Sequence, residues 1–145
     1  MRVSTRGRYA LRFLIDLAER ESRGYISLKE VADRQSVSKK YLEQIVPVLN
    51  IAGLLKTNRG YRGGYTLARP ASEITVADVL EATEGSLMPV PCLDNEVPGC
   101  ENKRSCTTFS MWEGLGNVVK SYLSGVTIED LVREERSKSY DDYCI

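Results

Sequence analysis

The sequence predicts a mainly α-helical protein with one short β-hairpin and a long helix near its C-terminal end. Three observations lead to this fold class. Apolar residues recur at helical spacing in several segments that begin at capping residues. A glycine-rich stretch separates two short runs that are typical of strands. The chain has 145 residues, 42% of them hydrophobic, which is enough to form one compact core.

The first two helices are predicted from amphipathic patterns. Residues 9–20 place their apolar side chains on one face, at Leu11, Leu14, Ile15 and Ala18. Ser27 and Glu30 then form a capping-box pattern, which predicts the start of a second helix. The buried side of that second helix should hold Leu28, Val31 and Ala32.

A third helix should run from its N-cap residue Ser38 to a stop at Gly53, with Pro47 bending it slightly. Its inward side chains should be Leu42, Ile45, Val46 and Leu49. Residues 54–68 then favour two strands joined by a turn with Gly60, Gly63 and Gly64. Two helices joined by a tight turn and followed by a hairpin form a helix-turn-helix with a wing.

The C-terminal part should contain three more helices. Residues 75–78 cap one that Gly85 ends, and Thr127 with Asp130 caps the last. Between them, residues 108–124 carry an apolar stripe that is too broad for a helix exposed on a small domain. We therefore expect a symmetric dimer, whose interface residues are Met111, Trp112, Leu115, Val119 and Tyr122.

Charge is divided unevenly, although the formal net charge is zero. Residues 1–62 hold 13 Lys/Arg and 6 Asp/Glu, and the rest of the chain holds 7 and 14. A basic half gains free energy by releasing counterions from nucleic acid, whereas chance clustering on a solvated surface is the alternative interpretation. Arg12 and Asp16 interrupt the first apolar segment, so we expect no signal peptide, no membrane partner and a cytoplasmic location.

The third helix should expose side chains of the types that read bases in the major groove of DNA. Glu43 is informative because phosphates repel a carboxylate, so on a DNA-facing helix it must discriminate among bases. Arginines beside the glycine turn of the wing suit a narrow minor groove. An ordinary solvated helix face is the alternative. The candidate DNA-contacting residues are Arg2, Arg8, Tyr9, Ser38, Lys39, Lys40, Glu43, Gln44, Arg59 and Arg62. Arg6 is expected to contact the DNA backbone together with Arg2, Arg8 and Tyr9.

Three of the four cysteines, Cys92, Cys100 and Cys106, lie in a loop-like segment of a chain without histidine. Their spacing differs from the paired cysteines of structural zinc sites, and the usual sites that include histidine are excluded. Thiolates suit iron–sulfur clusters, and irregular spacing suits a loop that folds around a cluster and releases it. Zinc and a thiol–disulfide sensor are the alternatives. Cys106 also precedes a predicted helix, whose dipole should lower the pKa of the thiol.

Four segments together resemble the Rrf-type winged-helix transcription regulators: STRGRYALRFLIDLA, YLEQIVPVLNIAGLL, RGYRGGYTLA and the three-cysteine loop. This family includes the iron–sulfur cluster regulator IscR and the nitric-oxide-sensitive repressor NsrR. The resemblance covers about residues 1–135. It implies a dimeric bacterial regulator of double-stranded operator DNA, in which the long helix crosses its twin and a bound cluster sets DNA affinity or sequence preference. Members without the cysteines read other signals, including partner enzymes.

The resemblance is incomplete at the fourth cluster ligand. IscR-like members have a histidine three residues after the last cysteine, where this chain has Phe109. NsrR-like members use a carboxylate near the N-terminus of the other subunit, and Arg8 and its neighbours offer none. The candidates that remain are an exogenous group or one of Cys144, Asp94, Glu96 and Glu101. The resemblance favours a [2Fe–2S] cluster, with [4Fe–4S] as the alternative.

Three parts are therefore predicted: a winged helix-turn-helix DNA-binding domain in residues 1–85, a cluster-binding loop in residues 86–106, and a dimerisation helix with a C-terminal helix and tail in residues 107–145. The leading hypothesis is a dimeric transcription regulator controlled by an iron–sulfur cluster. The competing hypothesis is a zinc-stabilised or thiol-based regulator that acts through a protein partner. We expect neither an enzyme nor a small-molecule substrate, because the usual catalytic groups are missing from the sequence.

Overall fold

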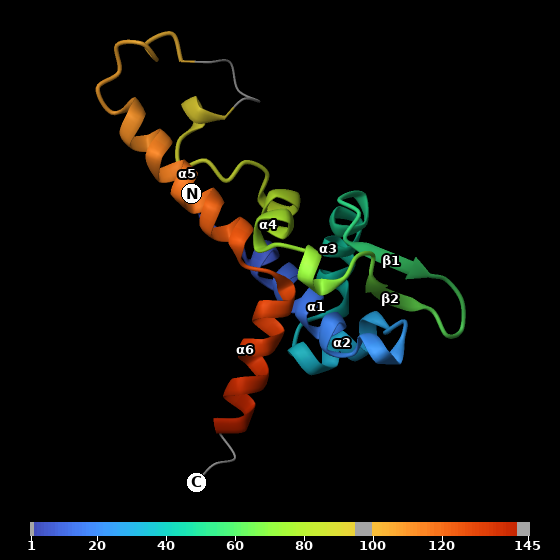
Figure 1. Ribbon diagram of the computed structural model, residues 1–145. Coiled ribbons are helices and arrows are strands. Elements are labelled where there is room, and N and C mark those ends of the chain that lie inside the picture. The colour runs from blue at the N-terminus through green and yellow to red at the C-terminus, as the bar shows by residue number, and fades with distance from the viewer. Residues whose placement is uncertain (1, 95–99, 142–145) are drawn as a thin grey trace.

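The computed structural model describes residues 2–94 and 100–141 of the chain (Figure 1). The mainly α-helical fold class with one hairpin is confirmed. Its helices and strands are α1 (Thr5–Glu19), α2 (Leu28–Gln35), α3 (Lys39–Ile51), β1 (Leu55–Asn58), β2 (Gly64–Leu67), α4 (Val76–Glu84), α5 (Phe109–Gly125) and α6 (Ile128–Asp141). Short 3₁₀ turns lie at Glu21–Arg23 (η1), Ala71–Glu73 (η2) and Pro91–Leu93 (η3).

Helix α1 begins four residues earlier than its apolar pattern predicts. The hydroxyl of Ser4 caps the helix by accepting a hydrogen bond from the backbone N–H of Gly7 at 3.3 Å. Glu84 at the end of α4 accepts from the same N–H at 3.1 Å. This second acceptor comes from a distant segment, so the local sequence does not reveal it. The most buried face of α1 is also rotated from the predicted one, since Leu14 is buried while Leu11, Ile15 and Ala18 are half-buried.

The helix-turn-helix and the hairpin match the predicted elements closely. The capping box of Ser27 and Glu30 is present, and the side chain of Ser38 caps α3. All four predicted inward side chains of α3 are buried, and Pro47 lies inside the helix. Strands β1 and β2 pair antiparallel, with Leu55 opposite Leu67. Two backbone hydrogen bonds of 2.8 and 2.9 Å also join Tyr65 to Ile26, which ties the hairpin to the segment that precedes α2.

Helix α1 lies at the centre of the core and contacts helices from both halves of the chain. Ile128 and Val132 of α6 belong to the same apolar cluster as Phe13 and Leu14 of α1. The predicted cap of α6 is present, with Thr127 and Asp130 bonded reciprocally. The C-terminal helix therefore completes the core formed by the N-terminal helices, and the division of the chain into three parts stays a prediction.

Helix α5 extends away from the rest of the molecule (Figure 1). Its exposed large apolar side chains are Met111, Leu115, Val118 and Tyr122. Gly116 is the buried residue of this helix. Met88 packs closely against it, since a Cβ at this position would lie 2.9 Å from Sδ of Met88. No helix in the described part of the chain is long and apolar enough to cross a membrane.

Candidate DNA interface and cysteine cleft

The outward face of α3 exposes the side chains that were predicted to contact DNA. Lys39, Lys40, Glu43 and Gln44 are all exposed, on the side opposite the buried leucines of the helix. Ser38 is exposed as well, but its hydroxyl accepts a hydrogen bond from the N–H of Tyr41 at 3.1 Å. Nζ of Lys39 lies 3.5 Å from Oε1 of Glu43. Glu43 therefore has a partner within its own helix when DNA is absent.

The wing also exposes its predicted contacts. Arg59 and Arg62 lie in the turn between β1 and β2, where Gly60 has φ of 120°, a conformation that favours glycine. Sequence reasoning missed Tyr61, which stands between the two arginines and has its ring wholly exposed. An aromatic residue between two arginines in a glycine turn is the signal that would have found it. The tip of the wing thus offers two cations and one aromatic ring.

The N-terminal candidates have mixed surroundings. Arg2 and Arg8 are exposed, and Arg8 donates a hydrogen bond to the hydroxyl of Thr5 at 3.0 Å. Tyr9 is half-buried against the ring of Tyr41, with 5.7 Å between the ring centroids. Arg6 was placed beside the DNA-contacting residues, but its guanidinium donates to the backbone carbonyl of Thr83. Arg6 therefore joins α1 to α4.

Sequence reasoning also missed the buried charge that fixes α1 against α2. Asp16 is only 1% exposed, and Arg34 of α2 donates two hydrogen bonds to its carboxylate, at 2.6 and 3.0 Å. The hydrogen bond that Arg34 donates to Asp16 is the main cause that raises the pKa of Arg34 above its ordinary value. Gln35 donates to the same carboxylate at 3.1 Å. This paired charge keeps α2 in register with α1, which the local sequence pattern does not reveal.

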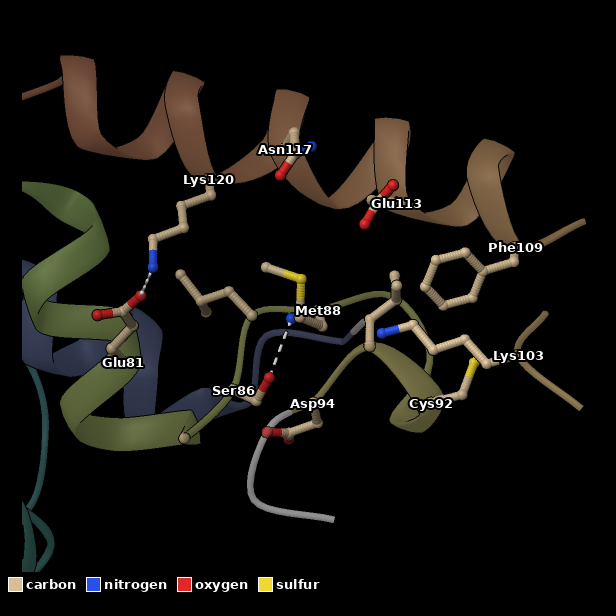
Figure 2. Close-up of a pocket in the computed structure, with 13 residues that line it drawn as sticks. Glu81, Ser86, Met88, Cys92, Asp94, Lys103, Phe109, Glu113, Asn117 and Lys120 are labelled. Atoms are coloured by element: carbon tan, nitrogen blue, oxygen red, sulfur yellow. Dashed lines mark hydrogen bonds and ion pairs between the residues drawn. The ribbon is translucent and has the colours of Figure 1, made fainter. Parts of the chain in front are cut away.

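A cleft of about 750 Å³, which we call the cysteine cleft, lies between the end of α4, η3 and α5 (Figure 2). Cys92 on η3 lines it and is half-buried. Across the cleft, Nζ of Lys120 on α5 lies 3.4 Å from Oε1 of Glu81 on α4. Phe109 stands at the position where IscR-like members have a histidine ligand, and it is half-buried. Nζ of Lys103 lies 4.8 Å from the centre of its ring. This cleft thus holds one of the three loop thiols.

The other two loop cysteines, Cys100 and Cys106, are exposed. The sulfur of Cys106 lies 3.4 Å from the hydroxyl of Thr108, and this hydrogen bond is the largest cause that lowers the pKa of the thiol. This direction is the predicted one, and backbone N–H groups of Thr108 and Phe109 at the start of α5 lower the pKa of the thiol further. Within residues 2–94 and 100–141, no three Cys, Asp or Glu side chains lie close enough together to hold a metal ion. Two candidates for the fourth ligand, Glu96 and Cys144, lie outside the described residues.

A helix-turn-helix with a basic outward face, followed by a hairpin that bears arginines at its tip, defines a winged-helix DNA-binding protein. Residues 3–134 match the model of the Rrf2 family, which is described as iron-dependent transcriptional regulator. The chain belongs to the Rrf2 family of DNA-binding transcription regulators.

Known proteins resemble the chain over most of its length. The HTH-type transcriptional regulator IscR of Photorhabdus laumondii is 36% identical over 135 residues, which cover 93% of this chain and 81% of that protein. The structure of CymR, the global cysteine regulator of B. subtilis, matches with a TM-score of 0.76 and 36% identity over 92% of this chain and 98% of that one. The IscR structure from T. potens matches with a TM-score of 0.72 and 33% identity, over 93% and 88%.

These relatives confirm the resemblance seen in the sequence. The chain is a winged-helix transcription regulator and not an enzyme. They differ in the signal that their names state, since CymR is named a cysteine regulator and the family is described as iron-dependent.

Proposed function

We propose that the chain is a homodimeric regulator whose binding to operator DNA is controlled by an iron–sulfur cluster held by Cys92, Cys100 and Cys106. The observation that carries this proposal is a set of three thiols directly before the exposed helix α5, in a chain that has no histidine. The family's description as iron-dependent supports the metal. We also propose that the protein is located in the cytoplasm.

The donor set fits a cluster in its chemistry. Thiolates are the usual cluster ligands, and the hydrogen bond from Thr108 favours the thiolate form of Cys106. Cys92 is held on a short 3₁₀ turn, whereas Cys100 and Cys106 are exposed, so the loop would close on the cluster from one side. A bound cluster would supply a centre that reacts with oxidants or nitric oxide and depends on iron supply. A [2Fe–2S] form is the first choice, and the fourth ligand would be a loop carboxylate, Cys144 or an exogenous group.

The position of the loop supports a role in control. Met88 and Pro89, near the start of the loop, pack on Gly116 of α5. The last cysteine of the loop precedes Phe109, the first residue of α5, by three positions. Binding of a cluster by the loop would therefore change how α5 is held against α4. If α5 forms the dimer, this change alters the spacing of the two DNA-reading heads. A cluster shifts that equilibrium only by its different affinity for the two arrangements.

The exposed stripe of α5 supports a second copy of the chain as partner. Leu115 and Tyr122 of the predicted interface are 42% and 71% exposed, and Val118 beside them is 67% exposed. Such a stripe on one protruding helix is typical of an interface. Trp112 and Val119 are half-buried and would lie at its edge. In the dimer, the exposed face of each α3 would enter the major groove and each wing the adjacent minor groove.

A thiol-based regulator without a cluster is the second candidate. Two exposed cysteines in one loop, one of them with a lowered pKa, are the arrangement expected of a redox-sensitive pair. The similarity to a protein named as a cysteine regulator favours the same interpretation. In this alternative an oxidant would take two electrons and two protons from the thiols of Cys100 and Cys106, which would join as a disulfide. Zinc would be a further occupant of the thiols.

The visible spectrum of anaerobically purified protein separates these candidates. We expect charge-transfer absorbance in the wild type, and its loss in each of Cys92→Ala, Cys100→Ala and Cys106→Ala, with the fold unchanged by circular dichroism. Thr107→Ala, an exposed neighbour in the same loop, is the matched control and should keep the absorbance. A colourless wild type with stoichiometric zinc favours a zinc site, and one without metal favours the thiol sensor. Cys144→Ala tests the fourth ligand, because losing that ligand should shift the spectrum or make the cluster labile.

A further inference from the structure

A second cleft, of about 610 Å³, lies between α3 and the β1–β2 hairpin, and we call it the wing cleft. Its walls are joined by several contacts. The hydroxyl of Thr57 on β1 lies 3.2 Å from Oδ1 of Asn50 on α3, and both residues line the cleft. Gly64 allows β2 to approach Ile26 closely, because a Cβ at this position would lie 2.4 Å from the carbonyl oxygen of Ile26. The hairpin is therefore held against α3 and against the segment that precedes α2.

This anchoring brings the first turn of α2 to the wall of the wing cleft. Lys29 is the second residue of α2, lies only three residues after Ile26, and is exposed in the wall. The capping box fixes this turn, with Oε2 of Glu30 accepting from the N–H of Ser27 at 3.1 Å. Lys29 was not among the DNA-contacting residues that the sequence indicated. Its place follows from the contact between the hairpin and the start of α2.

The wing cleft is cationic. Lys29, Lys39 and Arg59 line it, and Glu43 is the one carboxylate among its described lining residues. Glu43 pairs with Lys39 at 3.5 Å. In the part of the chain that the structure describes, no ion pair neutralises Lys29 or Arg59. Asn50 and Thr57 add polar groups to the same walls. The cleft therefore suits an extended chain of anionic groups that can also accept hydrogen bonds.

DNA supplies such a chain in the required place. When α3 lies in the major groove and the wing in the neighbouring minor groove, the strand that separates the two grooves passes between them. We propose, building on the proposed DNA-binding function, that the wing cleft seats the phosphodiester backbone of this strand and that Lys29 is one of its phosphate-binding residues. A phosphate here also competes with Glu43 for Lys39, which releases the Glu43 carboxylate toward the bases.

The salt dependence of DNA affinity tests this assignment. The probe is a duplex recovered by the wild type from random double-stranded DNA, and its affinity is measured by fluorescence anisotropy over a series of KCl concentrations. Loss of one phosphate contact reduces the slope of log affinity against log salt by about 0.9. We expect this reduction in Lys29→Ala, together with about three- to tenfold weaker binding at moderate salt and an unchanged selected sequence.

Two variants serve as controls. Lys29→Arg keeps the charge and should keep the wild-type slope. Lys138→Ala removes the same charge from α6, where Nζ of Lys138 pairs with Glu134 at 2.7 Å, and should also keep that slope. The assignment is overturned if Lys29→Ala has the slope and affinity of Lys138→Ala, or if it changes the selected sequence, which would make Lys29 a base-reading residue. If the wild type selects no duplex, the proposed DNA-binding function itself is refuted. This result can be told apart from the two outcomes that overturn the assignment of Lys29.

Discussion

The wing cleft and the cysteine cleft differ in the charge of their walls. The β1–β2 hairpin of the first and helix α5 of the second lie on opposite sides of the molecule (Figure 1). Three cations and one carboxylate line the wing cleft among the described residues. In the same part of the chain, Lys103 and Lys120 line the cysteine cleft together with the carboxylates Glu81, Asp94 and Glu113. The charge of the wing cleft suits a polyanion, and that of the cysteine cleft does not. The formal net charge of zero hides this division.

The two clefts also differ in how their walls are held. Backbone hydrogen bonds between Ile26 and Tyr65 and a capping box fix the wing cleft. In the cysteine cleft, Cys92 lies in the wall while Cys100 and Cys106 are exposed. The proposed DNA-reading face is thus formed by the chain alone, whereas the proposed sensing site would need a ligand to gather its thiols. This difference suits a regulator whose signal acts on the arrangement of preformed reading heads.

The largest effect is expected from breaking the proposed dimer, because both reading heads then lose their shared tether. Leu115→Asp combined with Val118→Asp places two charges in the exposed stripe of α5. We expect monomers by light scattering and operator affinity lower by about 10²-fold or more, since two linked half-site contacts become one. Ser124→Asp, an exposed position on the opposite side of α5 by helical spacing, is the control that should stay dimeric. A double variant that remains dimeric would remove α5 from the interface.

A smaller effect is expected from Glu43, and it concerns sequence preference. Glu43→Ala removes the carboxylate that pairs with Lys39 in the free protein and that phosphates would repel. We expect discrimination at one base position to change by about 1–3 kcal/mol, while overall affinity changes less. Selection from random duplexes measures this. Glu21→Ala on η1 is the control and should select the wild-type sequence. If Glu43→Ala also selects the wild-type sequence, then Glu43 is only a solvated residue of α3.

The smallest effect is expected from the capping box beside Lys29. Ser27→Ala removes the N-cap of α2 and should lower the free energy of unfolding by about 1 kcal/mol near neutral pH. Hydrogen bonds from Ser27 lower the pKa of Glu30 below 4.5 in the folded protein, so this stabilisation is present above pH 4.5 and is lost as the pH falls through the lowered pKa. Urea unfolding of both proteins at several pH values should show the difference narrowing below pH 4.5. A difference that does not depend on pH would contradict the role of Glu30.

Local signals predicted most elements, because capping residues and apolar spacing act within a few residues of each other. The starts of α2 and α3 are examples, since Ser27 and Ser38 cap them as expected. What the sequence could not predict depends on distant segments. The N-terminus of α1 is also bonded by Glu84, and the buried Asp16 is paired by Arg34.

The candidate DNA-contacting residues of α3 and the wing could be predicted as exposed because their neighbours are apolar at helical or strand spacing. Lys29 and Tyr61 could not be assigned from pattern alone. Lys29 reaches the wing cleft because the hairpin pairs with Ile26, a contact across nearly forty residues of chain. The proposed cluster ligands lie in a loop without periodicity, so chemistry rather than pattern indicated them.

The most direct test of the account compares one preparation of the protein with and without its cluster. Anaerobically purified protein is divided, the cluster is removed from one part, and the affinity of both parts for the selected duplex is measured at one salt concentration. Coupling between a ligand and DNA typically changes affinity by about 5- to 150-fold, and we expect a change in this range. Cys92→Ala should match the cluster-free part. Equal affinities for the two parts, with the dimer intact in both, would contradict control of DNA binding by the cysteine loop.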